Sequence, residues 1–416
     1  MLDIKLIQKE IDQVITKLKS RNVDERLLKG LSHLVQQRNL LLVELNQANE
    51  QKNIISRTLA NAIDKKKLLI QAQEIKKIIH DLETRIKIFQ DELDLVLPTI
   101  PNLPLDQVPA GDETNNQVIL QKTTLGPGLI TDVKPHYEIA LEKNLIDFTR
   151  AAKLSGARFV CYKNEGALLM RALQNFMLDV QLKQGYQELI PPFLVNSAAL
   201  YGTAQLPKFA GDSFKIDQQD LWLIPTAEVP LVNYFQNEIL DLNQPIKLTA
   251  YSPCFRSEAG SSGKDTKGLI RMHQFHKVEL VKITNRANAF TEFELCLSDA
   301  ERILELLKIP YQRVLLAAGD MGFSAQMTYD LELWLPSEQK FREVSSVSYC
   351  GDFQARRAMI RYRNEIGKTE YAHTINGSGL AIDRVFAALL ELGQKPDGTV
   401  VFPEVLWPYT KGIKKI

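Results

Sequence analysis

The sequence contains only four cysteines in 416 residues, and none of them forms a C-x-x-C pair. They are Cys161, Cys254, Cys296 and Cys350. This wide spacing argues against a zinc ribbon, a redox dithiol and the disulfide framework of a small secreted protein. We therefore expect a protein of a reducing compartment, with no zinc among its cofactors.

The sequence also lacks a net charge. Its 51 lysines and arginines are balanced by 50 aspartates and glutamates, which gives a formal charge of +1. The molecule as a whole is therefore no polycation, and a surface that binds nucleic acid would have to be local.

Long apolar runs are missing as well. The N-terminus, MLDIKLIQKE, contains acidic residues and lacks the apolar core of a signal peptide. No apolar run approaches the roughly 18 residues that a membrane span needs. We expect a cytoplasmic protein with no membrane partner, whose 45% hydrophobic residues fill a globular core.

The familiar phosphate-binding loops are absent from the sequence. Around Gly263 and Lys264 a P-loop would need glycine where Glu258 stands and a hydroxyl where Asp265 stands. The segment NGSGLAI, from Asn376, contains G-x-G but lacks the third glycine of a dinucleotide-binding fold. A nucleotide would therefore have to be bound in another way.

The N-terminal quarter contains two series of apolar residues spaced by fours and threes. The first series is Leu27, Leu31, Leu34, Leu41, Leu45, Ala48, Ile55 and Leu59, and the second is Ile75, Ile79, Leu82, Ile86, Phe89, Leu93 and Val96. This heptad spacing predicts two helices of about 35 residues, each about 50 Å long, that pair as an antiparallel hairpin. We expect the turn at Asp64–Lys67. The spacing alone leaves open a projecting arm, a dimerisation coiled coil or a packed bundle.

The segment from Leu97 to Asn116 contains four prolines followed by a polar tail, and we interpret it as a linker. The chain beyond it mixes amphipathic helices with short alternating strands. We therefore predict an α+β protein with two domains, residues 1–105 and residues 106–416.

The segment FRSEAGSSGKDTKGLIRMHQF, from Phe255 to Phe275, raises the question of an anion site. A strand over residues 268–283 would place alternate side chains on one face, since the strand period is two. These are Arg271, His273, Phe275, Lys277 and Glu279, and the same rule puts Arg256 and Glu258 on one face of the preceding strand. Guanidinium groups suit phosphate, an aromatic ring suits a purine, and a carboxylate suits an ammonium or hydroxyl group. The alternative is a solvated strand with a cross-strand salt bridge.

Several ordered segments resemble the bacterial type of seryl-tRNA synthetase, a family of class II aminoacyl-tRNA synthetases. The resemblance covers essentially the whole chain. The matching segments are LSGARF (154–159), NFMLDVQLKQGYQELIPPFLVN (175–196), YGTAQLPKF (201–209), IPTAEVPL (224–231), the segment from Phe255 through HKVEL (276–280), GDMGFSAQMTYDLELWLP (319–336), REVSS (342–346) and NGSGLAIDR (376–384).

The resemblance implies a helical tRNA-binding arm followed by a catalytic domain whose antiparallel sheet is flanked by helices. It implies a serine site made of Thr226, Ala227, Glu228, Glu279 and Ser378. It implies an ATP site made of Arg256, Ser257, Glu258, Arg271, Phe275, Glu343, Val344, Ser345, Ser346 and Arg384. Within that set, Arg256 and Arg384 would be catalytic, and Glu343 and Ser346 would hold Mg²⁺ through ATP.

The implied reaction is the activation of L-serine with ATP, followed by transfer of the seryl group to tRNA(Ser), and to selenocysteine tRNA where one exists. The arm would bind the tRNA, and the enzyme would be a homodimer. Two alternatives are an amino-acid ligase of the same fold that charges a carrier protein, and a non-catalytic RNA-binding paralogue. The former should lack the arm, and the latter should have lost Arg256, Glu279 or Arg384.

Two segments depart from the family's pattern. SSVSY, from Ser345 to Tyr349, stands where SSCSN is common, and Asp383 stands where many members have glycine. Beside Arg384, an aspartate could restrain the guanidinium group by a salt bridge.

Overall fold

The computed structural model describes residues 1–61, 65–259 and 267–416. The chain divides into two compact units, Met1–Leu103 and Pro104–Ile416. Among the described residues, no helix has both the length and the apolar character needed to cross a membrane.

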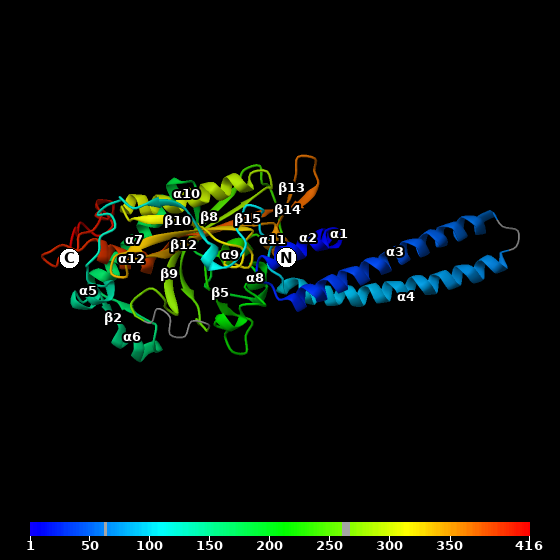
Figure 1. Cartoon of the computed structure of the whole chain (residues 1–416), viewed down its shortest axis with the longest axis horizontal. Coiled ribbons are helices and arrows are strands. Elements are labelled where there is room, and N and C mark those ends of the chain that lie inside the picture. The colour runs from blue at the N-terminus through cyan, green and yellow to red at the C-terminus, as the bar shows by residue number, and fades with distance from the viewer. Residues whose placement is uncertain (62–64, 260–266) are drawn as a thin grey trace. The chain divides into compact units, whose positions relative to one another are not determined.

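The first unit is helical and is dominated by a hairpin of two long helices that lie side by side (Figure 1). Its helices are α1 (Ile4–Lys9), α2 (Ile11–Lys19), α3 (Glu25–Asn61) and α4 (Lys66–Val96), followed by the 3-10 turn η1 (Leu97–Thr99). The predicted hairpin is thereby confirmed. The predicted turn lies partly outside the described residues, and Lys66 and Lys67 belong to α4 rather than to a turn.

The two long helices bury the apolar series that predicted them. Along the hairpin the buried cluster consists of Leu41, Ala48, Ile75, Ile79 and Leu82. Towards the start of α3, the short helices α1 and α2 add further buried residues, including Ile7, Val14 and Leu18. The sequence analysis did not anticipate these two helices, because six to nine residues give too few turns for a clear repeat.

The second unit contains the remaining elements. The helices and 3-10 turns are η2 (Glu113–Asn115), α5 (His136–Glu142), α6 (Phe148–Ser155), α7 (Asn164–Lys183), α8 (Ser197–Gly202), η3 (Ala210–Asp212), α9 (Glu228–Asn233), α10 (Ala289–Leu307), α11 (Phe353–Ala358), α12 (Ile382–Leu392) and η4 (Glu404–Leu406). The strands are β1 (Gln117–Lys122), β2 (Ile146–Asp147), β3 (Cys161–Tyr162), β4 (Gln187–Glu188), β5 (Leu194–Val195), β6 (Trp222–Leu223), β7 (Ile239–Leu240), β8 (Ile246–Phe255), β9 (Gln274–Thr284), β10 (Tyr311–Leu315), β11 (Met327–Leu335), β12 (Lys340–Gly351), β13 (Arg361–Arg363), β14 (Thr369–Tyr371) and β15 (His373–Ala381).

An eight-stranded sheet organises this unit, in the order β1-β10-β11-β12-β15-β9-β8-β4. Its strand pairs are antiparallel except for the parallel pair of β4 and β8. The predicted antiparallel sheet flanked by helices is confirmed.

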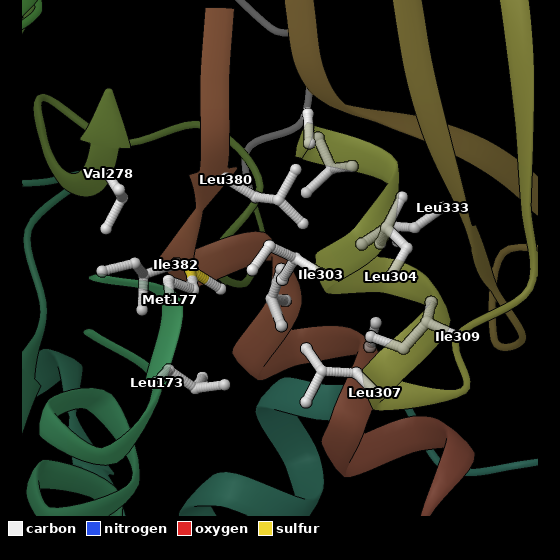
Figure 2. Packing of buried hydrophobic residues seen from close by; sticks show 14 of the residues in the cluster. Leu173, Met177, Val278, Ile303, Leu304, Leu307, Ile309, Leu333, Leu380 and Ile382 are labelled. Carbon is white, nitrogen blue, oxygen red and sulfur yellow. The ribbon is translucent and has the colours of Figure 1, made fainter. Parts of the chain in front are cut away.

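The helices α7, α10 and α12 pack against this sheet through one shared apolar core. Figure 2 shows part of that core, with labelled side chains from helices, from strands and from the connection between α10 and β10: Leu173, Met177, Val278, Ile303, Leu304, Leu307, Ile309, Leu333, Leu380 and Ile382. In β9, Val278 and Leu280 belong to this core, so the intervening Glu279 points to the opposite face. That alternation leaves one face of the sheet free to form a polar site.

The helix-covered face of β9 also contains a buried charge network. The Lys282 side chain is fully buried, and its Nζ lies 3.0 Å from Glu292 Oε2 and 3.2 Å from Asp299 Oδ2, both on α10. The Tyr186 hydroxyl donates to Asp299 Oδ2 at 2.9 Å. A buried cation with two carboxylates ties α10 to the sheet, and removal of the cation would take the nearest positive charge away from both anions.

We predict that Lys282→Met lowers the free energy of unfolding by about 3–5 kcal/mol, because both buried carboxylates lose their nearest cation. The matched control is Lys247→Met. Lys247 is 24% exposed and lies 3.9 Å from Glu292 Oε2, and its loss should cost less than about 1 kcal/mol.

Urea unfolding followed by tryptophan fluorescence measures this difference. All three tryptophans, Trp222, Trp334 and Trp407, lie in the second unit and report on it alone. Equal destabilisation by the two substitutions would contradict the network's proposed contribution.

Candidate active site

A cavity of about 530 Å³ lies on the polar face of the sheet. Its lining combines carboxylates, cations and short hydroxyl or amide side chains, namely Thr226, Glu228, Arg256, Glu258, Arg271, Lys277, Glu279, Glu343, Ser346, Ser348, Asn376 and Ser378. Thr203, Ala204, Gln205 and Phe209, which come from the loop after α8, also line it.

A second cavity of about 190 Å³ adjoins the first. The two share lining residues, which are Arg256, Glu258, Arg271, Lys277, Glu343 and Ser378. The second is otherwise more apolar, with Leu269, Ile270, Met272, Phe275, Val344 and Ala381 beside Asp383 and Arg384. The two cavities therefore form one site with a polar part and a partly apolar part.

Glu279 is the central buried anion of the larger cavity. It is 1% exposed, it accepts a hydrogen bond of 2.6 Å from the Thr226 hydroxyl, and it forms an ion pair with Lys277. Thr226 precedes α9, whereas Glu279 and Lys277 alternate with core residues along β9. The cation and the hydroxyl compensate the buried charge, as a carboxylate in an apolar surrounding requires.

Glu228, in the first turn of α9, is the second buried carboxyl group. Its Oε1 accepts hydrogen bonds from Gln354 Nε2 at 2.6 Å and from Asn376 Nδ2 at 3.0 Å. Burial and the nearby Glu279 carboxylate raise the pKa of Glu228 to about 7. One of the two carboxyl groups is therefore paired with a cation, while the other is held by neutral amide donors and takes up a proton near neutral pH.

The basic groups of the site lie just beyond the ends of two strands. β8 ends at Phe255 and β9 begins at Gln274, so Arg256, Glu258 and Arg271 stand outside the strands. The prediction of a strand that already includes Arg271 and His273 is wrong, as is the prediction that Arg256 and Glu258 share a strand face. Glu258 adopts a left-handed backbone with a φ of 52°.

The arginines nevertheless converge on the shared part of the two cavities. Arg271 Nη1 lies 3.3 Å from Glu258 Oε2, and the Arg256 guanidinium lies 5.1 Å from the centre of the Phe275 ring. Arg384, near the start of α12, donates from Nε to the Ile270 carbonyl at 3.3 Å and lies 3.7 Å from Glu343 Oε2. Residues 260–266, which belong to the segment Phe255–Phe275, lie outside the described residues.

A β-bulge in β12 brings Glu343 onto the site's face. In the pairing with β11, Leu331 faces Ser345 and Glu332 faces Glu343, so Val344 is the extra residue. Without the bulge, Glu343 and Ser346 would point to opposite faces, because three positions separate them. With it, both line the larger cavity.

These two side chains offer oxygen ligands, but not a complete metal site. Within the part of the chain that the structure describes, no three His, Cys, Asp or Glu side chains converge to hold a metal ion. Asp330 lies across from Ser346 in the β11–β12 pairing. Burial and the Glu343 carboxylate raise the pKa of Asp330 well above its usual range.

Comparison with known proteins assigns the family. Residues 1–104 match the seryl-tRNA synthetase N-terminal domain, and residues 213–392 match the tRNA synthetase class II core domain (G, H, P, S and T). Serine–tRNA ligase of Mycoplasma mobile is 53% identical over 417 residues, which cover 98% of this chain and 99% of that protein. The chain belongs to the seryl-tRNA synthetase family.

Other relatives of this family extend over the full chain. Serine–tRNA ligase of Metamycoplasma arthritidis is 51% identical over 100% of this chain and 99% of its own. The structure of seryl-tRNA synthetase from Pyrococcus horikoshii complexed with ATP matches with a TM-score of 0.90 and 36% identity, over 100% of this chain and 99% of that one. Cytoplasmic serine–tRNA ligase from Naegleria fowleri in complex with AMP matches with a TM-score of 0.87 and 28% identity, over 100% and 98%.

Most side chains that the family resemblance singled out line one of the two cavities. Among the described residues, three of them line neither cavity. The Ala227 side chain is buried beside α9, the Ser257 hydroxyl donates to the Gly211 carbonyl at 2.8 Å, and the Ser345 hydroxyl donates to the Ser378 carbonyl at 2.6 Å. Direct contact of these three with a ligand would have to use backbone groups.

Among the polar residues that were not assigned from the sequence are Lys277, Ser348 and Asn376, which line the larger cavity, and Gln354, which donates to Glu228. Lys277 was on the predicted face of β9, and its contact with Glu279 follows from the period of two. Ser348 lies two positions after Ser346 in β12 and therefore shares its face of the strand. Gln354 lies 126 positions from Glu228, and no local pattern links the two.

Of the departures from the family's pattern, Val347 and Tyr349 line neither cavity, whereas Asp383 lines the smaller one. Val347 is fully buried in the core under the helices, and the Tyr349 hydroxyl forms a hydrogen bond of 2.8 Å with His373 Nδ1. Asp383 does not restrain Arg384 as expected. Its carboxylate instead accepts from the Tyr162 hydroxyl and from the His276 backbone N–H, each at 2.5 Å.

We predict that the stability of the Glu228→Gln variant, relative to that of the unchanged chain, increases as the pH rises. The folded-state pKa of about 7 lies above the unfolded value near 4.5, so the folded state keeps a proton that the unfolded state has released. The loss of stability that the raised pKa of Glu228 causes is absent below pH 4.5 and complete above about pH 7. A neutral glutamine avoids this loss and still accepts the two amide hydrogen bonds.

The unfolding temperatures of both proteins, compared between about pH 5 and about pH 8, measure this effect. The difference should grow in favour of glutamine across that interval. A difference that is constant with pH would show that Glu228 has an ordinary pKa.

Proposed function

We propose that this chain is a serine–tRNA ligase that activates L-serine with ATP to seryl-adenylate and then transfers the seryl group to tRNA(Ser). The observation that carries the proposal is the pairing of two adjoining cavities, one with two buried carboxyl groups and one bounded by arginines. Full-length relatives that bear this name, and related structures complexed with ATP or AMP, support it.

The polar end of the larger cavity is the proposed serine site. Glu228 and Glu279 would accept hydrogen bonds from the substrate ammonium and hydroxyl groups, with Thr226 and Ser378 completing a small pocket. A site built to hydrogen-bond a hydroxyl rejects alanine, because buried polar groups would be left unpaired. A larger amino acid such as threonine would have to be rejected by its size instead.

The shared part and the smaller cavity form the proposed ATP site. Arg256, Arg271 and Arg384 would neutralise the phosphates, and the Phe275 ring, against which Arg256 stacks, would support the purine. Glu258 already fixes Arg271 through an ion pair. These contacts hold the guanidinium groups in place before ATP arrives, which reduces the reorganisation needed for catalysis.

Mg²⁺ fits the oxygen donors of this site when ATP supplies the other ligands. Glu343 and Ser346 offer a carboxylate and a hydroxyl, which are ligands of the hard type that Mg²⁺ prefers. When bound, the ion would neutralise phosphate charge. Every other part of the proposed mechanism rests on the protein's own side chains.

The proposed mechanism needs no protein nucleophile. The serine carboxylate attacks the α-phosphorus of ATP and pyrophosphate leaves, and a hydroxyl of the terminal ribose of the tRNA then takes the acyl group from the seryl-adenylate, with release of AMP. The two carboxyl groups orient the amino acid, while Arg256 and Arg384 stabilise the charge that develops on the phosphate. The reaction would thus be driven by positioning and electrostatics.

The helical hairpin is the proposed site of tRNA binding. In the proposed cytoplasmic homodimer, the arm of one subunit would bind a tRNA whose acceptor end lies in the active site of the other subunit. The match of residues 1–104 to the family's N-terminal domain supports tRNA rather than a carrier protein as the acceptor. The presence of Arg256, Glu279 and Arg384 around the two adjoining cavities disfavours a non-catalytic paralogue.

We predict serine-dependent exchange of pyrophosphate into ATP. The assay is run with each of the twenty amino acids, and alanine and threonine are the matched controls, since they lack the hydroxyl group or add a methyl group. Serine should exceed alanine by about 10⁴ in kcat/KM. An absence of exchange with serine, or faster exchange with another amino acid, would refute the assignment.

We also predict that shortening the hairpin separates the two half-reactions. Replacement of residues 46–85 by a short glycine-serine linker retains the buried base of the hairpin, including Leu31 and Leu93. Serine-dependent exchange should remain within about twofold of the full chain, whereas tRNA charging should fall by at least about 100-fold, because a phosphate-binding surface is lost. Unimpaired charging would contradict the proposed role of the hairpin.

A further inference from the structure

The three residues that precede Arg271 are held by a buried histidine outside the site. His136 begins α5, and its Nε2 accepts a hydrogen bond of 3.1 Å from the Leu269 backbone N–H. The His136 side chain is 2% exposed. Leu269 and Ile270, by contrast, line the smaller cavity, so this hydrogen bond fixes one wall of that cavity from behind.

Glu391 fixes the orientation and the tautomer of His136. The Leu269 backbone N–H can only donate, so Nε2 is the acceptor and the ring proton resides on Nδ1. Nδ1 lies 2.8 Å from Glu391 Oε1, which also accepts from the His136 backbone N–H at 2.9 Å. The Glu391 carboxylate is fully buried and accepts two further hydrogen bonds, from the backbone N–H and hydroxyl of Ser337.

Gly268 allows the close approach of the chain to this histidine. Its backbone is left-handed, with a φ of 75°, and a Cβ atom there would lie 2.4 Å from His136 Nε2 and 3.1 Å from Tyr137 Cδ1. A side chain at this position would therefore push the imidazole aside, and Nε2 could no longer accept the hydrogen bond from the Leu269 backbone N–H. Both the backbone conformation and the close contact require glycine.

The same short segment is bound on its other side by the active-site arginine. Arg384 Nε donates to the Ile270 carbonyl at 3.3 Å, and Arg384 and Glu391 both belong to α12. Residues 269–270 are thus tied to one helix at two points, directly by Arg384 and through His136 by Glu391. Arg271, the next residue, lines the part that the two cavities share.

We propose that His136 is a positioning residue for ATP, which holds residues 268–270 so that Arg271 and the wall of the smaller cavity are in place before the nucleotide binds. This inference rests on the proposed function. His136 does not touch the substrates. Its contribution should appear in the affinity for ATP and not in the affinity for serine, because the serine pocket is built on α9, β9 and β15.

The test uses two amide substitutions that differ in length by one methylene group, both in the full chain. His136→Asn retains a donor near the position of Nδ1 and can keep the Glu391 hydrogen bond, but it is too short to reach Leu269. His136→Gln can place its carbonyl oxygen near the position of Nε2 and accept from Leu269. We expect Asn to raise the Kd and KM for ATP about tenfold, the effect of one lost hydrogen bond, and Gln to recover most of it, with the KM for serine within about twofold in both.

ATP binding is measured by calorimetric titration without serine, and the KM values by pyrophosphate exchange. If the unchanged chain showed no serine-dependent exchange, the proposed function would fail, while the titration would still test His136. An unchanged Kd for ATP in His136→Asn, or equal weakening by Asn and Gln, would overturn the proposal. If His136→Asn does not fold, Gly268→Ala takes its place: a rise of about tenfold in the Kd for ATP supports the proposal, and an unchanged Kd overturns it.

Discussion

The structure depends on one strand that must satisfy two environments at once. β9 buries Val278 and Leu280 against the helices, while the alternate residues Lys277 and Glu279 face the polar cavity. A buried carboxylate is tolerated only when it is compensated, and Lys277 and Thr226 provide that compensation. The apolar face stabilises the fold, and the same alternation creates the site.

The other parts of the site are arranged around this strand by departures from regular structure. A bulge in β12 turns Glu343 towards the larger cavity. Arg256 lies just after the end of β8, and Arg271 lies before the start of β9. α12 then binds both sides of the segment before Arg271. Regular strands thus supply the buried carboxylate and its cation, while irregular segments supply the groups that are proposed to face the phosphates.

The sequence predicted those features that follow from a repeat. The apolar series predicted the hairpin of α3 and α4, and the period of two correctly put Phe275, Lys277 and Glu279 together. The same rule failed at Arg271, because β9 begins only at Gln274, and it could not foresee the bulge at Val344. The contact of Gln354 with Glu228, across 126 positions, depends on tertiary packing and has no local signature.

A crystal structure with a non-hydrolysable analogue of seryl-adenylate tests the central claim most directly, namely that the two adjoining cavities bind the amino acid and the nucleotide. We predict that the seryl ammonium and hydroxyl groups lie within hydrogen-bonding distance of Glu228 and Glu279, with the adenine against Phe275. An analogue bound with its seryl group away from both carboxylates, or with its adenine outside the smaller cavity, would contradict the account.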